Sequence, residues 1–423
     1  MFTFHFPNSY TFHNQHMIGI LMSSTSLKPS DSYSPLYFLA SLGAGGLAVT
    51  FFMILMHWVP HPDQPVPVFA DAMAVLETGS LPMKVATLTA MVGIAVFAFL
   101  NVKYLIWNFS ALSAFRKTEA YTALRNSNAE TTLLAAPLAT AMFVNAMFII
   151  GLTFVPGLWS IVEYLFPMAL AAFLAIGIWA FSLLSDFLGR VLTKGGVFDV
   201  TANNSFAQLL PAFALAMIGV GLAAPAAMSS NVITVGAALI LSTFFGITAI
   251  VYTLIAVTTA FGSMLQHGTA KEAGPTLMVV VPILTVLGIL FLRQNHGLHT
   301  GFDSHGTAGE TMVFLARMLT VQVVFLLLGL LVLRRQGYFS DFVFGSKTSP
   351  GSYALVCPGV ALSVMIHFFV NKGLVDAGVI DKFGLVFWIL SGIAIAFQVA
   401  MIALVLRLNR QHFSATALAP QNA

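Results

Sequence analysis

Charged side chains are scarce in this chain of 423 residues. Lys, Arg, Asp and Glu together make up 8% of it, against roughly a quarter of an average soluble domain. So few charges cannot cover the surface of a soluble protein of this length, which argues against a cytosolic enzyme. The formal net charge of +3 is also too small an excess to indicate nucleic-acid binding.

Cysteine and catalytic motifs are scarce as well. The single cysteine, Cys357, excludes a disulfide framework and a thiolate metal cluster. The sequence has no Gly-rich phosphate loop after a strand, no Gly-x-Ser-x-Gly and no His-Glu-x-x-His. We therefore expect no enzyme activity, no cofactor and no ATP hydrolysis.

Long apolar runs are abundant instead. Hydrophobic residues make up 58% of the chain and the mean hydropathy is +0.90. A membrane-spanning helix needs about 20 mostly apolar residues. Ten such stretches predict an all-α integral membrane protein with ten transmembrane helices: Pro35–Val59, Lys84–Phe109, Pro137–Val155, Val162–Leu184, Ser205–Ala224, Val232–Phe261, Pro275–Leu292, Glu310–Leu333, Ser352–Val370 and Phe383–Leu406.

The cations of the loops predict the orientation. With the N-terminus inside, 12 Lys and Arg residues fall on cytoplasmic segments and four fall on the other side, namely Lys84, Arg293, Lys372 and Lys382. This asymmetry predicts a multi-pass protein of the cell (inner or plasma) membrane with both termini cytoplasmic. We expect a flexible cytoplasmic extension over residues 1–34, a transmembrane domain over 35–408 and a cytoplasmic tail over 409–423. The extension has no signal-peptide pattern, and Met1 and Met22 are both compatible with the start of translation.

Proline and glycine are concentrated in the odd-numbered predicted helices. The first carries Gly43, Gly45 and Gly46, while the fifth, seventh and ninth carry Pro211, Pro282 and Pro358. A proline inside a helix removes a backbone hydrogen bond, and a membrane tolerates this where the freed carbonyl faces protein or water. The pattern predicts five helical hairpins whose kinked odd helices surround a central pore. The alternative is that these residues only help helices to pack.

Three segments carry a resemblance to a known family. They are Ser205-Phe-Ala-Gln-Leu-Leu-Pro211, Gly274-Pro-Thr-Leu277 with Val281-Pro282, and Ser352-Tyr-Ala-Leu-Val-Cys-Pro-Gly359. The sequence resembles the tellurite-resistance/C4-dicarboxylate transporter family, which includes the plant slow anion channels, over roughly residues 35 to 408. The resemblance implies five hairpins around a pore, anion transport and a homotrimer.

The gate is where the sequence departs from this family. A phenylalanine on the ninth helix closes the pore of characterised channels of the family, but alignment of the motif places Cys357 or Pro358 there. The resemblance therefore leaves the gate to another helix or removes it. Phe143, Phe148 and Phe213 are candidates on the third and fifth helices.

Polar and proline residues on the odd helices form the predicted anion path. Asn145, Gln208 and His367 are polar groups at membrane depth, and a water or a permeant ion is one kind of partner for them. The full predicted set is Asn145, Gln208, Pro211, Phe213, Pro282, Cys357, Pro358 and His367. His367 would also give pH dependence near neutral pH.

Two cations fall inside predicted helices. Arg317 on the eighth helix either attracts anions near the external mouth or reaches the membrane interface with its long side chain. Lys103 is similar but lies near the predicted cytoplasmic end of the second helix, where the neighbouring Tyr104 and Trp107 favour an interfacial position.

Two further polar groupings have structural interpretations. His296, His299, Asp303 and His305 lie in the predicted loop after the seventh helix, but their spacing matches no standard zinc site, so we expect no metal. Asp186 and Arg190 are four residues apart and are expected to pair on the surface.

These patterns favour a membrane anion channel or transporter that passes small anions along the kinked odd helices. One alternative is a proton-coupled carrier for C4-dicarboxylates, sulfite or tellurite. A dicarboxylate needs paired cations in its path, and only Lys103 and Arg317 are at membrane depth, which favours small monovalent anions. The second alternative is a membrane subunit or an embedded enzyme of a larger complex.

Overall fold

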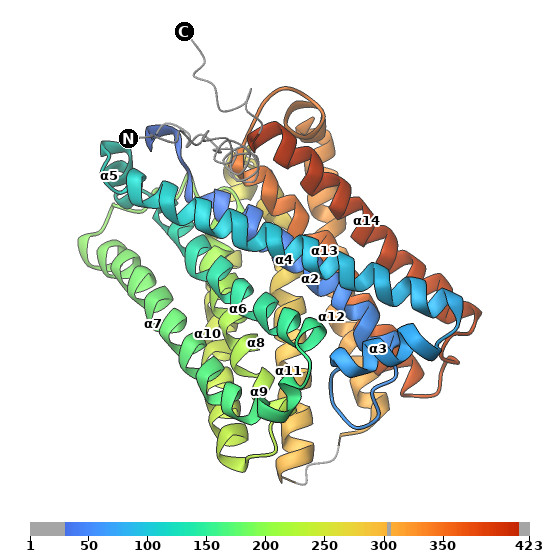
Figure 1. The fold of residues 1–423 in the computed structure, drawn as a ribbon. Helices are drawn as coiled ribbons and strands as arrows, with labels where there is room; N and C mark the ends of the chain where they lie inside the picture. Colours follow the sequence, from blue (N-terminus) through green and yellow to red (C-terminus); the bar gives the residue numbers. More distant parts are fainter. Residues whose placement is uncertain (1–29, 303–305, 414–423) are drawn as a thin grey trace, which may run out of the picture.

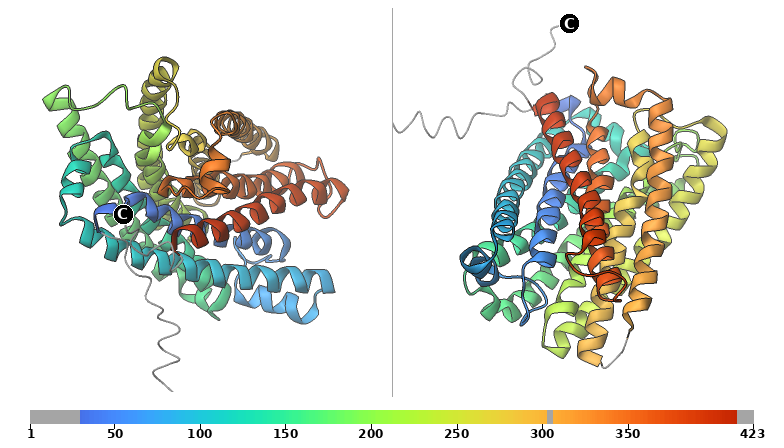
Figure 2. Two further views of the ribbon diagram at one scale, coloured as in Figure 1. Left: turned by 90° about the horizontal axis from the view of Figure 1, so that it is seen from above. Right: turned by 90° about the vertical axis from the view of Figure 1, so that its right-hand side faces the viewer.

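The computed structural model describes residues 30–302 and 306–413, and in this part of the chain it is helical with no strand. Ten segments are long and apolar enough to cross a membrane: Pro35–Trp58, Leu81–Phe115, Asn128–Phe154, Leu158–Lys194, Phe206–Met228, Val232–His267, Gly274–Phe302, Ala308–Arg335, Pro350–Val375 and Leu385–Phe413. The all-α, ten-span prediction is confirmed. The spans run side by side between two faces of the bundle (Figures 1 and 2).

The main helices of spans 1 to 10 are α2 (Phe38–Trp58), α4 (Leu81–Phe115), α6 (Ala135–Phe154), α7 (Val162–Lys194), α8 (Leu210–Leu222), α10 (Val232–His267), α11 (Val280–Phe302), α12 (Ala308–Arg335), α13 (Val356–Phe368) and α14 (Leu385–Phe413). Three short helices connect spans or end them: α3 (Phe69–Thr78), α5 (Glu119–Arg125) and α9 (Ala224–Met228). A π-helical turn, η9 (Phe369–Val375), continues α13.

Several helices extend beyond the apolar runs that predicted them. The clearest case is α11, which continues to Phe302 and so includes His296 and His299. The expectation of a loop at these two histidines is wrong, because polar residues can prolong a helix once it has left the apolar layer. Asp303 and His305 lie outside the described residues.

Every odd-numbered span begins with a 3₁₀ turn that leads into its α-helix. These turns are η2 (Pro35–Tyr37), η3 (Asn128–Leu134), η5 (Phe206–Leu209), η6 (Gly274–Met278) and η8 (Pro350–Leu355). Ser34, Ser127 and Ser205 precede three of them, and each hydroxyl accepts a hydrogen bond from the main-chain N–H two residues later. Three of the five turns therefore share the same serine cap, whereas η6 and η8 begin without a side-chain cap.

The position of the prolines corrects the prediction of kinked odd helices. Pro211 is the second residue of α8, while Pro282 and Pro358 are the third residues of α11 and α13. The first turn of a helix has main-chain N–H groups without intrahelical partners, so proline fits there without breaking a bond. These prolines mark the change from the 3₁₀ turn to the α-helix.

The odd-numbered spans form a closed ring of contacts. α2 contacts α6, α6 contacts α8, α8 contacts α11, α11 contacts α13, and α13 returns to α2. Their 3₁₀ turns repeat this order, from η2 through η3, η5, η6 and η8 back to η2. The order of contacts gives the bundle an approximate fivefold arrangement.

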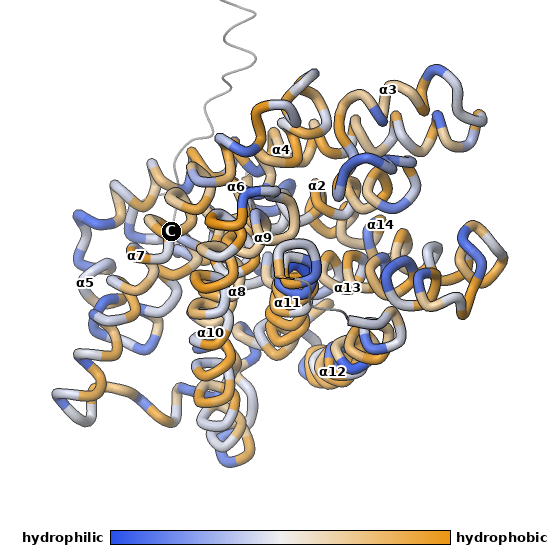
Figure 3. The backbone as a smooth tube through the Cα atoms, turned by 90° about the horizontal axis from the view of Figure 1, so that it is seen from below, coloured by the Kyte–Doolittle hydropathy of each residue, from blue (hydrophilic) through white to orange (hydrophobic). Residues whose placement is uncertain are grey.

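The even-numbered spans lie outside this ring. Between 61% and 94% of the most apolar stretch of each odd span is buried, against 17% to 44% for each even span. Figure 3 shows α4, α7, α10, α12 and α14 at the periphery and the odd helices toward the middle. The outer helices expose many large apolar side chains, as expected of surfaces that face lipid.

Glycine lets two inner helices approach α2 closely. A Cβ atom added at Gly43 or Gly46 would lie 3.0 Å or 2.9 Å from a Cγ1 atom of Val356 or Val360 on α13. At Gly45 it would lie 2.6 Å from Cγ of Met142 on α6. The glycine run of the first span therefore allows close helix contact.

The two ends of the described chain meet at one face. The Tyr37 hydroxyl lies 3.2 Å from Nδ1 of His412, and the Tyr37 ring also contacts Phe413. We call this end of the bundle the terminal face and the other end the opposite face. That the terminal face is cytoplasmic stays a prediction.

An ion-pair cluster at the terminal face corrects one sequence-based pairing. Arg190 pairs with Glu130 of η3 rather than with Asp186, and Asp186 accepts from Arg125 at 3.1 Å. Arg125 also lies 3.1 Å from Glu130, which is buried. Residues 125 and 130 fold back beside α7, so longer-range partners replace the pair on the same helix.

Candidate functional site

A cavity of about 820 Å³ lies inside the ring of odd spans. All five odd spans supply lining residues, and α7 adds Phe166, Ala169 and Phe173. Loop residues from the opposite face also line it, among them His61, Gln64 and Lys382. The cavity therefore extends from the membrane interior toward the opposite face.

The lining residues follow helical spacing on each inner helix. On α11 they include Pro282, Val286, Ile289, Arg293 and His296, which follow one another at steps of three or four residues. α2 and α13 show the same spacing, from Leu42 to His57 and from Cys357 to Phe368. Each inner helix thus turns one continuous face toward the cavity.

Five residues, one from each inner helix, form the innermost level of the lining. These residues, which we call the floor, are Leu42, Met142, Phe213, Pro282 and Cys357. On each inner helix, the floor residue lies within about two turns of the α-helix from the end of the preceding 3₁₀ segment. The floor is apolar except for the Cys357 thiol.

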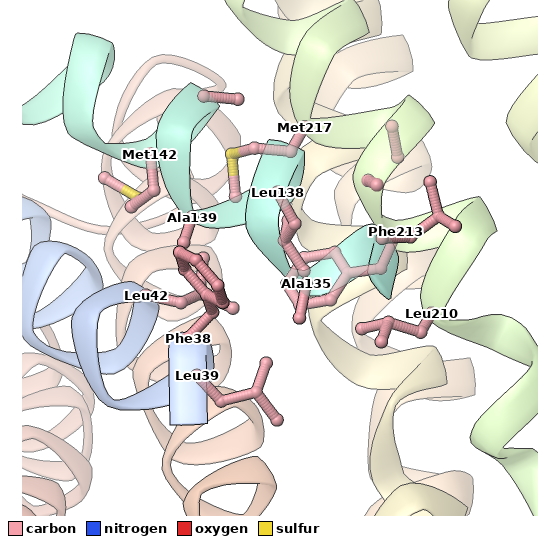
Figure 4. Packing of buried hydrophobic residues seen from close by; sticks show 14 of the residues in the cluster. Phe38, Leu39, Leu42, Ala135, Leu138, Ala139, Met142, Leu210, Phe213 and Met217 are labelled. Atoms are coloured by element: carbon pink, nitrogen blue, oxygen red, sulfur yellow. The ribbon is translucent and has the colours of Figure 1, made fainter. Parts of the chain in front are cut away.

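A buried apolar layer lies between the floor and the terminal face. Phe38 and Leu39 of α2, Leu138 of α6 and Leu210 of α8 are buried there and do not line the cavity. Figure 4 shows these side chains packed together with Leu42, Met142 and Phe213 of the floor. The cavity accordingly reaches the opposite face but ends before the terminal face.

Three cations line the mouth of the cavity. Arg293 lies on α11, Lys372 lies in the π-helical turn η9, and Lys382 precedes α14. Asp376 is the single carboxylate in the described lining, and its Oδ2 lies 3.3 Å from Nζ of Lys372. The mouth therefore has an excess of positive charge.

Arg293 is the deepest of these cations. Its Nη1 donates a hydrogen bond of 2.7 Å to the main-chain oxygen of Val220 on α8. Within the described residues it has no carboxylate within 4.0 Å. An arginine at this depth without a carboxylate partner gives the cavity an anion-attracting group with unused donors.

Histidines are the other ionisable groups at the mouth. His57, His61, His296 and His299 line the cavity, and Nδ1 of His61 lies 2.8 Å from the main-chain oxygen of Val59. Within the ranges 30–302 and 306–413, no three His, Cys, Asp or Glu side chains are grouped so as to hold a metal ion. The described histidines thus add polarity to the mouth without a metal-binding geometry.

Four of the eight residues predicted for the anion path line the cavity. They are Asn145, Phe213, Pro282 and Cys357. The Asn145 amide donates to the main-chain oxygen of Ala141 at 3.1 Å and points its nitrogen at the Met217 sulfur, 3.8 Å away. Asn145 and Thr285 are the polar side chains that the described residues place in the inner part of the lining, besides the Cys357 thiol.

The other four predicted path residues do not line the cavity. Gln208 lies in η5 and donates to the main-chain oxygen of Asn128 at 2.9 Å, so it ties two 3₁₀ turns together. Pro211 and Pro358 are buried in the first turns of α8 and α13. His367 is buried behind the wall, with its ring 6.3 Å from that of His57 and 6.4 Å from that of Trp58.

The two intramembrane cations are also away from the cavity. Lys103 and Arg317 are exposed on the outer helices α4 and α12, and neither lines the cavity. The interpretation of Arg317 as an anion-attracting group at the mouth therefore finds no support, and its exposed position favours the interfacial interpretation. Cys357, which the motif alignment places at the gate position of the family, lies in the floor; that this position is a gate stays a prediction.

Sequence reasoning missed the cations that do line the mouth. It counted Arg293, Lys372 and Lys382 among the loop charges and considered only Lys103 and Arg317 as cations at membrane depth. One signal was available for Arg293, because 11 residues make almost exactly three helical turns and so place it on the Pro282 face. No helical spacing in the sequence indicates that Lys372 and Lys382 face the cavity, because a π-helical turn and a loop position them.

A scan against protein-family models found no match, and no curated protein and no solved structure matched the chain. The resemblance to the tellurite-resistance/C4-dicarboxylate transporter family therefore stays a prediction.

Proposed function

We propose that this membrane protein is an anion channel or permease whose path is the cavity between the five odd spans. The observation that carries the proposal is the placement of Arg293, Lys372 and Lys382 around the mouth, with Asp376 as the single carboxylate of the described lining. Cations at a mouth with low-dielectric walls raise the local concentration of anions. The apolar walls beyond offer no fixed charge that would trap an ion.

The apolar layer between floor and terminal face is the proposed gate. A narrow apolar constriction resists an ion because water leaves it. Phe213 and the leucines beyond it supply this constriction, in the role that the family resemblance gave to a phenylalanine on the ninth helix. Movement of the floor residues would then connect the two faces.

A proton-coupled carrier for C4-dicarboxylates or sulfite is the second candidate, and two observations favour it. A dianion needs at least two cations along its path, and the mouth supplies three. The argument against dicarboxylates from Lys103 and Arg317 alone therefore no longer holds. A cavity that reaches only one face also fits an alternating-access carrier.

Anion flux into proteoliposomes tests the proposal and separates the two candidates. Chloride, nitrate, sulfite and malate are compared with and without a membrane potential and with and without a pH gradient. A channel for small anions gives chloride and nitrate flux that follows the potential. A carrier gives malate or sulfite uptake that follows the pH gradient. Absence of flux for all four anions contradicts the proposed function.

A further inference from the structure

The cavity combines two surfaces of different chemistry. Its mouth has three cations, while its inner part is walled by aliphatic, aromatic and methionine side chains from all five inner helices. α11 places Pro282 and Arg293 at the two ends of this inner part, and a rise of ~1.5 Å per residue separates them by roughly 16 Å. The apolar chamber is therefore about as long as half the bilayer core.

The polar groups of the inner chamber are few and partly occupied. The Thr285 hydroxyl lies 3.1 Å from the main-chain oxygen of Ala361 and 2.6 Å from the Gln322 amide that donates to it. The Asn145 amide nitrogen already donates within its own helix. A small inorganic anion inside the chamber would find little to replace its hydration shell, whereas an apolar group would bury its surface against the walls.

The methionines make the walls adaptable. Met53, Met56, Met142, Met217 and Met228 line the cavity. Unbranched methionine side chains adjust to ligands of different shape, and such residues are common on surfaces that accept several partners. The volume of about 820 Å³ is within the range of pockets that enclose an organic molecule.

We propose that the cavity binds organic monoanions that carry one carboxylate and an apolar body, with the carboxylate at Arg293 and the body along the inner walls. This inference rests on the proposed function, because it assigns a ligand class to the same anion path. This ligand class differs from small inorganic anions, which would find little in the chamber to replace their hydration shell. It also differs from dicarboxylates, because a second carboxylate placed in the inner chamber would have no cation beside it.

Titration calorimetry with a homologous series of carboxylates tests this inference. The full-length protein in lipid nanodiscs is titrated with butyrate, hexanoate and octanoate, and empty nanodiscs correct for partition into lipid. Each added CH₂ group should tighten the Kd about threefold to fourfold, as burial of a methylene predicts. Equal affinity for the three acids overturns the inference.

Three variants separate the head from the body of the ligand. Arg293→Gln should weaken all three acids by a common factor and leave the dependence on chain length intact. Val360→Thr, which keeps the shape of a wall residue but adds a hydroxyl, should reduce that dependence. Arg317→Gln, on the exposed side of α12, should change nothing. The assignment is contradicted if the chain-length dependence is the same in Val360→Thr as in the native protein. It is also contradicted if Arg317→Gln loses as much affinity for the acids as Arg293→Gln does.

Anion flux measured on the same protein preparation distinguishes a failure of the proposed ligand class from a failure of the proposed transport function. Chloride or nitrate flux without a chain-length dependence overturns the ligand class and leaves the anion path standing. Carboxylate binding with the expected dependence, but without flux of any anion, supports the binding site and contradicts the proposed transport function.

Discussion

Arg293 of α11 donates a hydrogen bond of 2.7 Å from Nη1 to the main-chain oxygen of Val220 at the end of α8. Both residues line the cavity, so the bond fixes the arginine between two inner helices. The other guanidinium donors have no carboxylate partner among the described residues. In the proposed function, this hydrogen bond holds Arg293 in place as the group that attracts the anion.

The floor gives the first prediction. Phe213→Ala removes the largest side chain of the floor, so the apolar constriction should widen and anion flux should rise about tenfold, which corresponds to a barrier lower by ~1.4 kcal/mol. Cys357→Phe adds an aromatic ring at the same level and should lower the flux. Nitrate flux in proteoliposomes measures both effects. Phe99→Ala, on the exposed face of α4, is the control, and unchanged flux in both floor variants would place the gate elsewhere.

Helix packing around α2 gives the second prediction. Gly45→Ala brings a methyl group to 2.6 Å from Met142 Cγ and 2.9 Å from Asn101 Nδ2, so α2 and its neighbours must move apart. We expect a loss of stability of about 1–3 kcal/mol, seen as a lower apparent Tm in detergent. Gly236→Ala on α10 meets nothing within 4 Å and should be neutral or stabilising. Equal Tm values for both variants would refute the close packing at Gly45.

The buried carboxylate of the terminal face gives the third prediction. Glu130 is buried and pairs with both Arg125 and Arg190, so Glu130→Gln leaves two arginines without their shared partner. Because these arginines reach solvent in part, the free energy of unfolding should fall by about 2–3 kcal/mol, which is less than the loss expected for a fully buried pair. Thermal unfolding measures it, and Glu119→Gln, an exposed carboxylate of α5, is the control. A Tm for Glu130→Gln equal to that of the control would show that the cluster adds nothing to stability.

Asp341 gives a prediction about pH. Hydrogen bonds from Lys347 at 2.7 Å and Lys271 at 3.0 Å lower the pKa of its carboxyl below the ordinary value. Its contribution to stability is therefore present above the unfolded pKa of about 3.9 and is lost as the pH falls through the lower folded pKa.

The comparison of variants isolates this contribution. Between pH 5 and pH 3, native protein should lose more of its apparent Tm than Asp341→Asn, in which the paired carboxylate is already absent. Asp63→Asn, at an exposed residue of the loop between α2 and α3, should follow the native profile. Parallel profiles for native protein and Asp341→Asn would refute the role of the two lysines.

The fold could largely be predicted from the sequence, because apolar runs of the required length specify spans directly. The division into inner and outer helices was also predictable from the placement of glycine and proline, although for a partly wrong reason. Pro211, Pro282 and Pro358 mark inner helices because they begin the α-helix after a 3₁₀ turn, not because they kink it. The 3₁₀ turns themselves have no distinctive hydropathy and could not be seen.

The site was less predictable, because a charge says nothing about its surroundings. Arg317 looked unusual on account of its membrane depth, yet it lies exposed on α12. Arg293 looked ordinary at the end of an apolar run, yet it lines the cavity. Only the folded ring determines which cation faces inward. Helical spacing from Pro282 was the one signal that pointed to Arg293.

The most direct test compares nitrate flux into proteoliposomes for Arg293→Gln and Arg317→Gln at low ionic strength. Both substitutions remove one arginine charge, but only Arg293 lines the cavity. Equal elution of the two variants on gel filtration checks that both are folded. Arg293→Gln should lower the flux about tenfold, because a loss of ~1.4 kcal/mol in the stabilisation of the anion corresponds to a factor of ten in rate. Arg317→Gln should leave the flux unchanged. Equal flux in the two variants would contradict the assignment of the cavity as the anion path.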